Sequence, residues 1–171
     1  MGNADRRAYE DLLRRYLPAL RRLTWSYTRE GCEQDDLLQE IALGLWTALP
    51  SFRGAASERT WLYRVAHNTA ISFVARRKRQ IDREQGDMPP EVAAPSLSPE
   101  SSMIEDQRRA RLSGAVQELP LSDRQIVVLH FEGLSAAEIA DVTGLSAGNV
   151  ATRLTRIRQK LSARMRGEEW A

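Results

Sequence analysis

The basic side chains near the end of the sequence are the residues best suited to bind a polyanion. Between Ala147 and Arg166 the chain carries many lysines and arginines and no acidic residue. The polar positions there recur at helical spacing, and they are Asn149, Thr152, Arg153, Arg156 and Lys160. Arginine can bond guanine through two acceptors, so we expect Arg153 or Arg156 to read a base of duplex DNA. Lys160, farther along, is expected to meet a phosphate.

Residues 135–161 predict the two helices that would position this face. Ser135 and Glu138 form a capping box that begins the first helix, and Ser146 is a candidate N-cap for the second. Gly144 stands where the chain must reverse. The predicted buried stripe of the second helix is Val150, Leu154, Ile157 and Leu161. This combination is typical of a helix-turn-helix, although a plain helical hairpin with a solvated basic face is the alternative.

Composition excludes several other classes of protein. The chain has 171 residues, a net charge of +2 and a single cysteine, so no internal disulfide is possible and a cytoplasmic location is expected. The first residues lack the apolar core of a secretory signal, and no apolar run is long enough to span a bilayer. We therefore expect a protein that is not integral to a membrane. Cys32 is expected to be an inert, partly buried thiol.

No cluster of residues predicts catalysis or metal binding. Cys32, His67 and His130 lack the spacing of metal ligands, and His67 is expected to be a structural histidine. The acidic pair Asp35 and Asp36 has no nucleophile or further carboxylates around it. The sequence thus predicts no enzyme activity, no cofactor and no small-molecule substrate.

Apolar periodicity predicts an all-α chain of two small helical domains joined by a flexible linker. Helices are expected over residues 6–28, 33–49, 58–83 and 103–119, followed by one that a capping box of Ser122 and Gln125 opens, and then by the helix-turn-helix. Residues 84–98 are rich in proline and acidic residues and predict the linker, which spans roughly 20 Å if flexible. Ser98-Pro99-Glu100 should restart the helix. The predicted domains are residues 1–83 and 99–171.

The second and third predicted helices carry two charged surfaces. On the second, Leu38, Ile41, Leu45 and Leu49 form an apolar stripe that Leu37 and Trp46 widen. Asp36, Gln39 and Glu40 lie on another side; acidic residues there suit the helix dipole, or else form a docking face for a basic partner. The third helix ends in Arg76, Arg77, Lys78 and Arg79, a cluster that favours phosphate contact.

These segments together resemble the bacterial RNA polymerase sigma factors of the sigma-70 family, most closely the extracytoplasmic-function group. DDLLQEIALGLWTALPSFRG at Asp35 to Gly54 and RTWLYRVAHNTAI at Arg59 to Ile71 are similar to that family's region 2. LPLSDRQIVVLHFEGLSAAEIADVTGLSAGNVATRLTRIRQKL, from Leu119 to Leu161, resembles its region 4. The resemblance covers nearly the whole chain.

The resemblance implies a function and assigns roles. Asp36, Gln39 and Glu40 would dock on core RNA polymerase. The melted minus-10 strand of promoter DNA would meet Phe52, Arg53, Asn68, Arg76, Arg77, Lys78 and Arg79. The minus-35 duplex would meet Asn149, Thr152, Arg153, Arg156 and Lys160, and an anti-sigma factor is the expected inhibitory partner. The alternatives are a stand-alone helix-turn-helix regulator, which would need a dimer interface or a ligand pocket, and a nucleic-acid enzyme.

Overall fold

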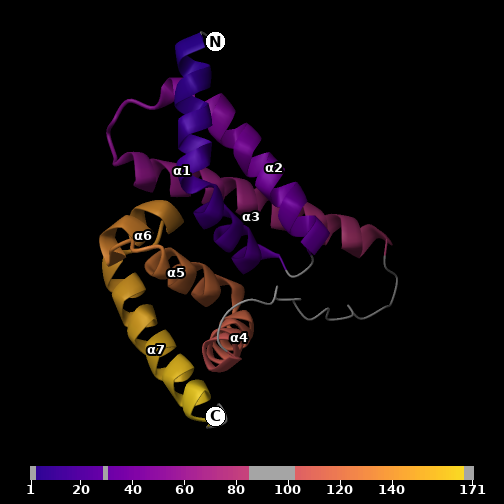
Figure 1. Ribbon diagram of the computed structural model, residues 1–171, viewed down its shortest axis with the longest axis vertical. Coiled ribbons are helices and arrows are strands. Elements are labelled where there is room, and N and C mark those ends of the chain that lie inside the picture. Colours follow the sequence, from indigo (N-terminus) through magenta and orange to yellow (C-terminus); the bar gives the residue numbers. More distant parts are fainter. Residues whose placement is uncertain (1–2, 29–30, 85–102, 168–171) are drawn as a thin grey trace. The chain divides into compact units, whose positions relative to one another are not determined.

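A computed structural model describes residues 3–28, 31–84 and 103–167 (Figure 1). Throughout these residues the regular structure is helical and no strand is present, which confirms the all-α prediction. The chain divides into two compact units: the first contains α1, α2 and α3, and the second contains α4, α5, α7 and most of α6. None of the described helices is both long enough and apolar enough to cross a membrane.

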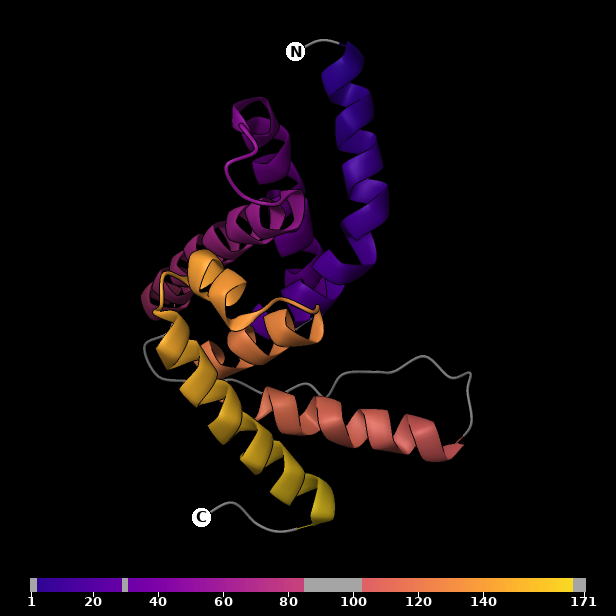
Figure 2. The same ribbon diagram turned by 90° about the vertical axis from the view of Figure 1, so that its left-hand side faces the viewer.

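The N-terminal unit is built from α1 (Asn3–Tyr27), α2 (Gly31–Ala48) and α3 (Glu58–Glu84), with a short 3-10 turn, η1 (Leu49–Ser51), after α2. α2 packs against both α1 and α3 (Figure 1). α1 continues through Pro18, and the helix bends about midway along its length (Figure 2), as expected where a proline removes a backbone donor. The fully buried side chains of this core include Leu20, Leu23, Leu37, Ile41, Leu45 and Leu62.

Two details of α2 differ from the sequence prediction. The fully buried stripe is Leu37, Ile41 and Leu45, whereas Leu38 is only half-buried. Because α2 contacts helices on two sides, its apolar arc is wider than a single stripe, and the sequence alone does not show where its centre lies. The helix begins at Gly31, two residues before its predicted start at residue 33, and Cys32 is exposed, so the prediction of a partly buried thiol was wrong.

The helices α2 and α3 approach each other closely at Gly44. A Cβ atom placed on Gly44 would lie 2.9 Å from the Thr69 Oγ1 atom of α3. That hydroxyl donates to the Val65 carbonyl over 2.9 Å, which holds it in place. Glycine is therefore the residue that fits this crossing without displacing a neighbour.

The C-terminal unit contains α4 (Met103–Gln117), α5 (Leu121–Phe131), α6 (Ala136–Thr143) and α7 (Ala147–Arg166). α7 packs on both α4 and α5. The predicted stripe of α7 is buried at each of its positions, and Ile126, Leu129 and Ile139 complete the core around Val150, Leu154, Ile157 and Leu161.

The predicted capping box at the start of α5 was wrong. The Pro120 carbonyl begins the helix by accepting from the amides of Asp123 (2.9 Å) and Arg124 (3.0 Å), and no side chain caps it. Gln125 is buried, and the Ser122 hydroxyl accepts from a side chain of α7. The proline already presents its carbonyl in an extended backbone, so the two polar side chains serve elsewhere. The predicted linker, beyond residue 84, and the predicted helix start at Ser98 lie outside the described residues.

Candidate nucleic-acid interface

The turn between α6 and α7 has the geometry of a helix-turn-helix. The Ser135 hydroxyl accepts from the Glu138 amide over 3.2 Å, and the Glu138 carboxylate accepts from the Ser135 amide over 2.8 Å, so the predicted capping box is present. Gly144 adopts a left-handed backbone with φ of 77° and donates its amide to the Ala140 carbonyl. The Ser146 hydroxyl accepts from the Asn149 amide over 3.2 Å and begins α7. The prediction from local sequence was therefore right in each of these details.

α7 turns its polar side outward along its first half. Asn149, Thr152 and Arg156 are exposed, while Val150, Leu154 and Ile157 on the other side are buried. A shallow depression of about 470 Å³ lies on this outer side, lined by Gly148, Asn149, Thr152, Arg153 and Arg156. The first turn of α7 carries no acidic residue. The positive end of the helix dipole therefore adds to the basic charge that faces solvent.

Arg153 differs from its neighbours on this face. Its Nε atom donates to Asp123 Oδ1 over 2.8 Å, and one terminal nitrogen donates to the Ser122 hydroxyl over 2.6 Å. Both partners belong to α5, and the Asp123 side chain is only 4% exposed. Arg156 lies 3.6 Å from the second Asp123 oxygen and stays 57% exposed. Arg156, more than Arg153, is thus in position to reach a ligand.

Sequence reasoning did not single out Asp123. It lies 30 positions before Arg153, which is too far for any helical spacing rule to relate the two. Asp123 stands in the polar run from Ser122 to Gln125, so the local pattern did not mark it as the buried partner of an arginine.

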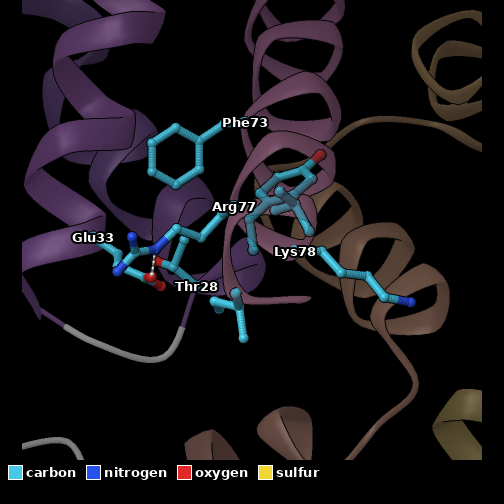
Figure 3. Close-up of a pocket in the computed structure, with 8 residues that line it drawn as sticks. Thr28, Glu33, Phe73, Arg77 and Lys78 are labelled. Carbon is cyan, nitrogen blue, oxygen red and sulfur yellow. Dashed lines mark hydrogen bonds and ion pairs between the residues drawn. The ribbon is translucent and has the colours of Figure 1, made fainter. Parts of the chain in front are cut away.

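The basic end of α3 is also held by acidic side chains, here from α2. Arg76 forms an ion pair with Glu40, and Arg77 donates to Glu33 over 2.7 Å. Figure 3 shows the Arg77 guanidinium turned toward Glu33, whereas the Lys78 side chain extends away from that pair. A hollow of about 200 Å³, whose lining includes apolar side chains such as Phe73, lies beside the pair. Of the four predicted phosphate-binding residues, two are therefore tied to α2.

The acidic side of α2 is arranged partly as predicted. Asp36 and Gln39 are exposed, and the nearby Leu43 is 64% exposed. Glu40 is the half-buried member of the set because it pairs with Arg76. Leu43 therefore lies open to solvent on the same helix as Asp36 and Gln39.

The loop between η1 and α3 carries two more predicted contacts. The Phe52 ring packs against Trp61 with a centroid separation of 4.9 Å, so Phe52 and Trp61 are both half-buried, while Arg53 is exposed. Ser57 begins α3 by accepting from the Thr60 amide over 3.0 Å. Asn68, farther along α3, is exposed. These residues lie on one connected stretch that leads toward the basic end of α3.

His67 faces the core and not the interface. Its Nδ1 atom lies 2.5 Å from the Tyr27 hydroxyl, and both side chains are buried. Burial lowers the pKa of His67 and raises the pKa of Tyr27. His67 is thus a structural residue, in agreement with the sequence prediction. Among the described residues no group of histidine, cysteine and carboxylate side chains is placed to hold a metal ion.

Comparison with known proteins places both units in one family. The profile of Sigma-70 region 2 matches residues 12–80, and that of Sigma-70 region 4 matches residues 109–161. The RNA polymerase sigma-H factor of Pseudomonas aeruginosa is 33% identical over 168 residues, which cover 92% of this chain and 86% of that protein. The ECF RNA polymerase sigma-E factor of Escherichia coli K12 is 30% identical over 169 residues, covering 92% and 86%.

A solved structure agrees with the fold. The sigma factor RpoE in complex with the anti-sigma factor NepR, from Bartonella quintana, matches with a TM-score of 0.77 at 23% identity, over 95% of this chain and 99% of that one. The chain belongs to the sigma-70 family of RNA polymerase sigma factors, in its extracytoplasmic-function group.

Proposed function

We propose that this chain binds core RNA polymerase and directs promoter-specific initiation of transcription by recognising the minus-35 duplex and the melted minus-10 strand. The observation that carries the proposal is a helix-turn-helix with an exposed polar face on α7, in one chain with a region 2 unit. The proposed domains are residues 1–83 and 99–171, joined by residues 84–98. The chain itself performs no catalysis in this proposal, because nucleotide addition belongs to the core enzyme.

The polymerase would dock on the acidic side of α2. Asp36, Gln39 and Glu40 supply its polar contacts, and the exposed Leu43 adds an apolar one. Complementary charge steers the association of two large proteins and suppresses wrong partners. A basic surface on the polymerase is therefore the expected counterpart.

The melted minus-10 strand would follow the path from the loop after η1 to the end of α3. Arg53, Asn68, Lys78 and Arg79 are exposed along this path and are the leading candidates for contact. Phe52 packs against Trp61 and would supply one side of a base-binding surface. Arg76 and Arg77 would contribute after exchanging their glutamate partners for phosphate.

The minus-35 duplex would meet the outer side of α7. Asn149, Thr152 and Arg156 are exposed near the N-terminal half of the helix, which in this motif enters the major groove. Lys160 lies farther along and would hold a phosphate. Arg153 was one of two candidates for base reading, and its pairing with Asp123 favours Arg156 for that role.

Partner and location follow from the family. The Bartonella quintana relative was solved with an anti-sigma factor, and we propose that an anti-sigma factor also regulates this chain. Sigma factors act where RNA polymerase acts, so the proposed location is the cytoplasm.

Reconstituted transcription tests the proposal. Core polymerase lacking any sigma factor is mixed with this protein and with promoter fragments from the bacterium that encodes it. The expected result is initiation at discrete start sites, with weak binding of the protein alone to the same duplexes. Tight, sequence-specific binding to duplex DNA without polymerase would support the stand-alone regulator instead.

A further inference from the structure

Asp123 is a buried carboxylate at the edge of the candidate minus-35 interface. It lies in the first turn of α5, outside the helix-turn-helix pair, and only 4% of its side chain is exposed. Both carboxylate oxygens point at arginines of α7: Oδ1 lies 2.7 Å from an Arg153 terminal nitrogen and 2.8 Å from its Nε, and Oδ2 lies 3.6 Å from Arg156.

The distances from Asp123 indicate different roles for the two arginines. Arg153 is held by two close contacts to Asp123 and a third to Ser122, which fixes its planar guanidinium against α5. A buried carboxylate strongly resists losing such a partner, because it would be left charged without compensation. Arg156 is different, because 3.6 Å is an ion-pair distance longer than a hydrogen bond and its side chain is 57% exposed.

We propose that Asp123 is a positioning residue that determines the minus-35 specificity of this protein. Asp123 holds Arg153 in one position at the edge of the depression on α7. It also orients Arg156, which is the arginine that reads a base. The inference rests on the proposed role of α7 in reading the minus-35 element. It goes further by assigning the selectivity to a residue on a helix that is not part of the helix-turn-helix.

The number of orientations open to an arginine before DNA binds determines how selectively it can read a base. Bidentate recognition of guanine needs the planar guanidinium in one plane, and a side chain already biased toward that plane loses less entropy on binding. Without the Asp123 charge, both arginines would be mobile cations close to the DNA backbone. Mobile cations contact phosphate in any sequence, which raises nonspecific affinity and lowers discrimination.

The test uses the holoenzyme formed from core polymerase and the full chain. Promoter fragments with a randomised minus-35 segment are bound, recovered and sequenced, and the enrichment at each position measures discrimination. Asp123→Asn keeps the shape of the side chain but removes its charge. The expected result is a loss of discrimination of about tenfold at one or two base positions, with unchanged or tighter binding to a duplex that lacks the element.

A matched control separates positioning from general charge. Glu118 pairs with Arg164 of α7 over 3.1 Å in a solvent-exposed contact, so Glu118→Gln makes the same change in net charge within the same unit. This variant should leave the enrichment profile unchanged. Ser122→Ala is the second probe, because it removes one contact to Arg153 and leaves the carboxylate in place. It should reduce discrimination in the same direction as Asp123→Asn, by about two- to threefold.

Each outcome is decisive. If Asp123→Asn lowers affinity for all sequences by one factor and leaves the enrichment profile as it was, the residue is merely structural and the inference is overturned. If Asp123→Asn does not fold, Ser122→Ala decides, and an unchanged profile for this variant overturns the inference. If the unmodified holoenzyme shows no preference at any minus-35 position, the proposed function of α7 itself fails, and the inference fails with it.

Discussion

At the end of α3, Arg76 and Arg77 pair with glutamates of α2 that remain partly open to solvent, whereas on α7 Arg153 pairs with an aspartate that is almost wholly buried. The exposed fractions of the acidic side chains are 38% for Glu40 and 18% for Glu33, against 4% for Asp123. All three pairs join neighbouring helices, so the difference lies in solvent access and not in topology.

This difference decides which arginines are available to DNA. An ion pair exposed to water stabilises a protein by about 0.2–1 kcal/mol, so Arg76 can exchange Glu40 for a phosphate at little cost. Breaking a buried pair costs about 3–5 kcal/mol, which a single phosphate contact does not offset. The number of basic residues on a helix therefore overstates the number of DNA contacts that the helix can make.

The largest expected effect is at the buried ion pair between Arg153 and Asp123. Arg153→Ala leaves Asp123 buried with only the distant Arg156, and we expect the free energy of unfolding of the C-terminal unit to fall by about 3 kcal/mol. Arg156→Ala is the matched variant and should cost less than about 1 kcal/mol. Amide hydrogen exchange, resolved by unit, measures both. Equal losses for the two variants would show that the burial of Asp123 does not matter.

The next largest effect concerns the acidic side of α2. Asp36→Lys combined with Glu40→Lys should weaken binding to core polymerase by about 1–3 kcal/mol, because like charges would then face each other. The measurement is affinity for core polymerase, with circular dichroism to verify that helical content is intact. Asp11→Lys, which reverses an exposed acid of α1, is the control and should have little effect. Unchanged affinity for the double variant would remove the docking assignment.

A smaller effect is expected at the basic end of α3, where exposed and paired cations can be compared. Lys78→Ala with Arg79→Ala removes two exposed cations, so the dependence of open-complex formation on salt should fall by about 1 to 1.5 in log–log slope. Arg77→Ala should change it by less, because Arg77 is occupied with Glu33. Both variants should affect the open complex more than initial closed-complex binding. Equal loss at the two stages would mean that these residues supply only general attraction.

The smallest expected effect is a dependence of the stability of the N-terminal unit on pH. Because burial lowers the pKa of His67 in the folded chain, the unfolded chain binds more protons near this histidine's usual value of about 6.5. The contribution of His67 to stability is therefore complete above that pH and is lost as pH falls below it. The N-terminal unit should show this loss in urea denaturation followed between pH 7 and 5. His67→Gln retains an acceptor for Tyr27 and should remove this part of the pH dependence.

Local patterns in the sequence predicted most of the fold. Each predicted helix in the described residues is present, and the turn between α6 and α7 was right in its capping box, its left-handed glycine and its N-cap serine. These features depend on residues within four positions of each other, which is why they can be read from the sequence. The Ser122 and Gln125 capping box shows the limit, because the same pattern also suits residues that face another helix.

The candidate site was less predictable because its pairings join distant positions. Glu40 and Arg76 are 36 positions apart, and Asp123 and Arg153 are 30 apart. The sequence indicated the acidic side of α2 and the basic residues of α3 and α7, and the structure places each of these groups on its helix. It did not indicate that the basic residues would be partly neutralised by acids of the neighbouring helix, because that depends on which helices pack together and in which register.

The close crossing at Gly44 has a mechanical consequence. The candidate docking side belongs to α2 and the candidate minus-10 path belongs to α3, and the two helices touch where a methyl group would already collide with Thr69. Close-packed interfaces have low compressibility and transmit displacement. If polymerase docks on α2 as proposed, a tilt of α2 would therefore be passed to α3 with little slack, and the proposed docking side and the proposed minus-10 path would move together.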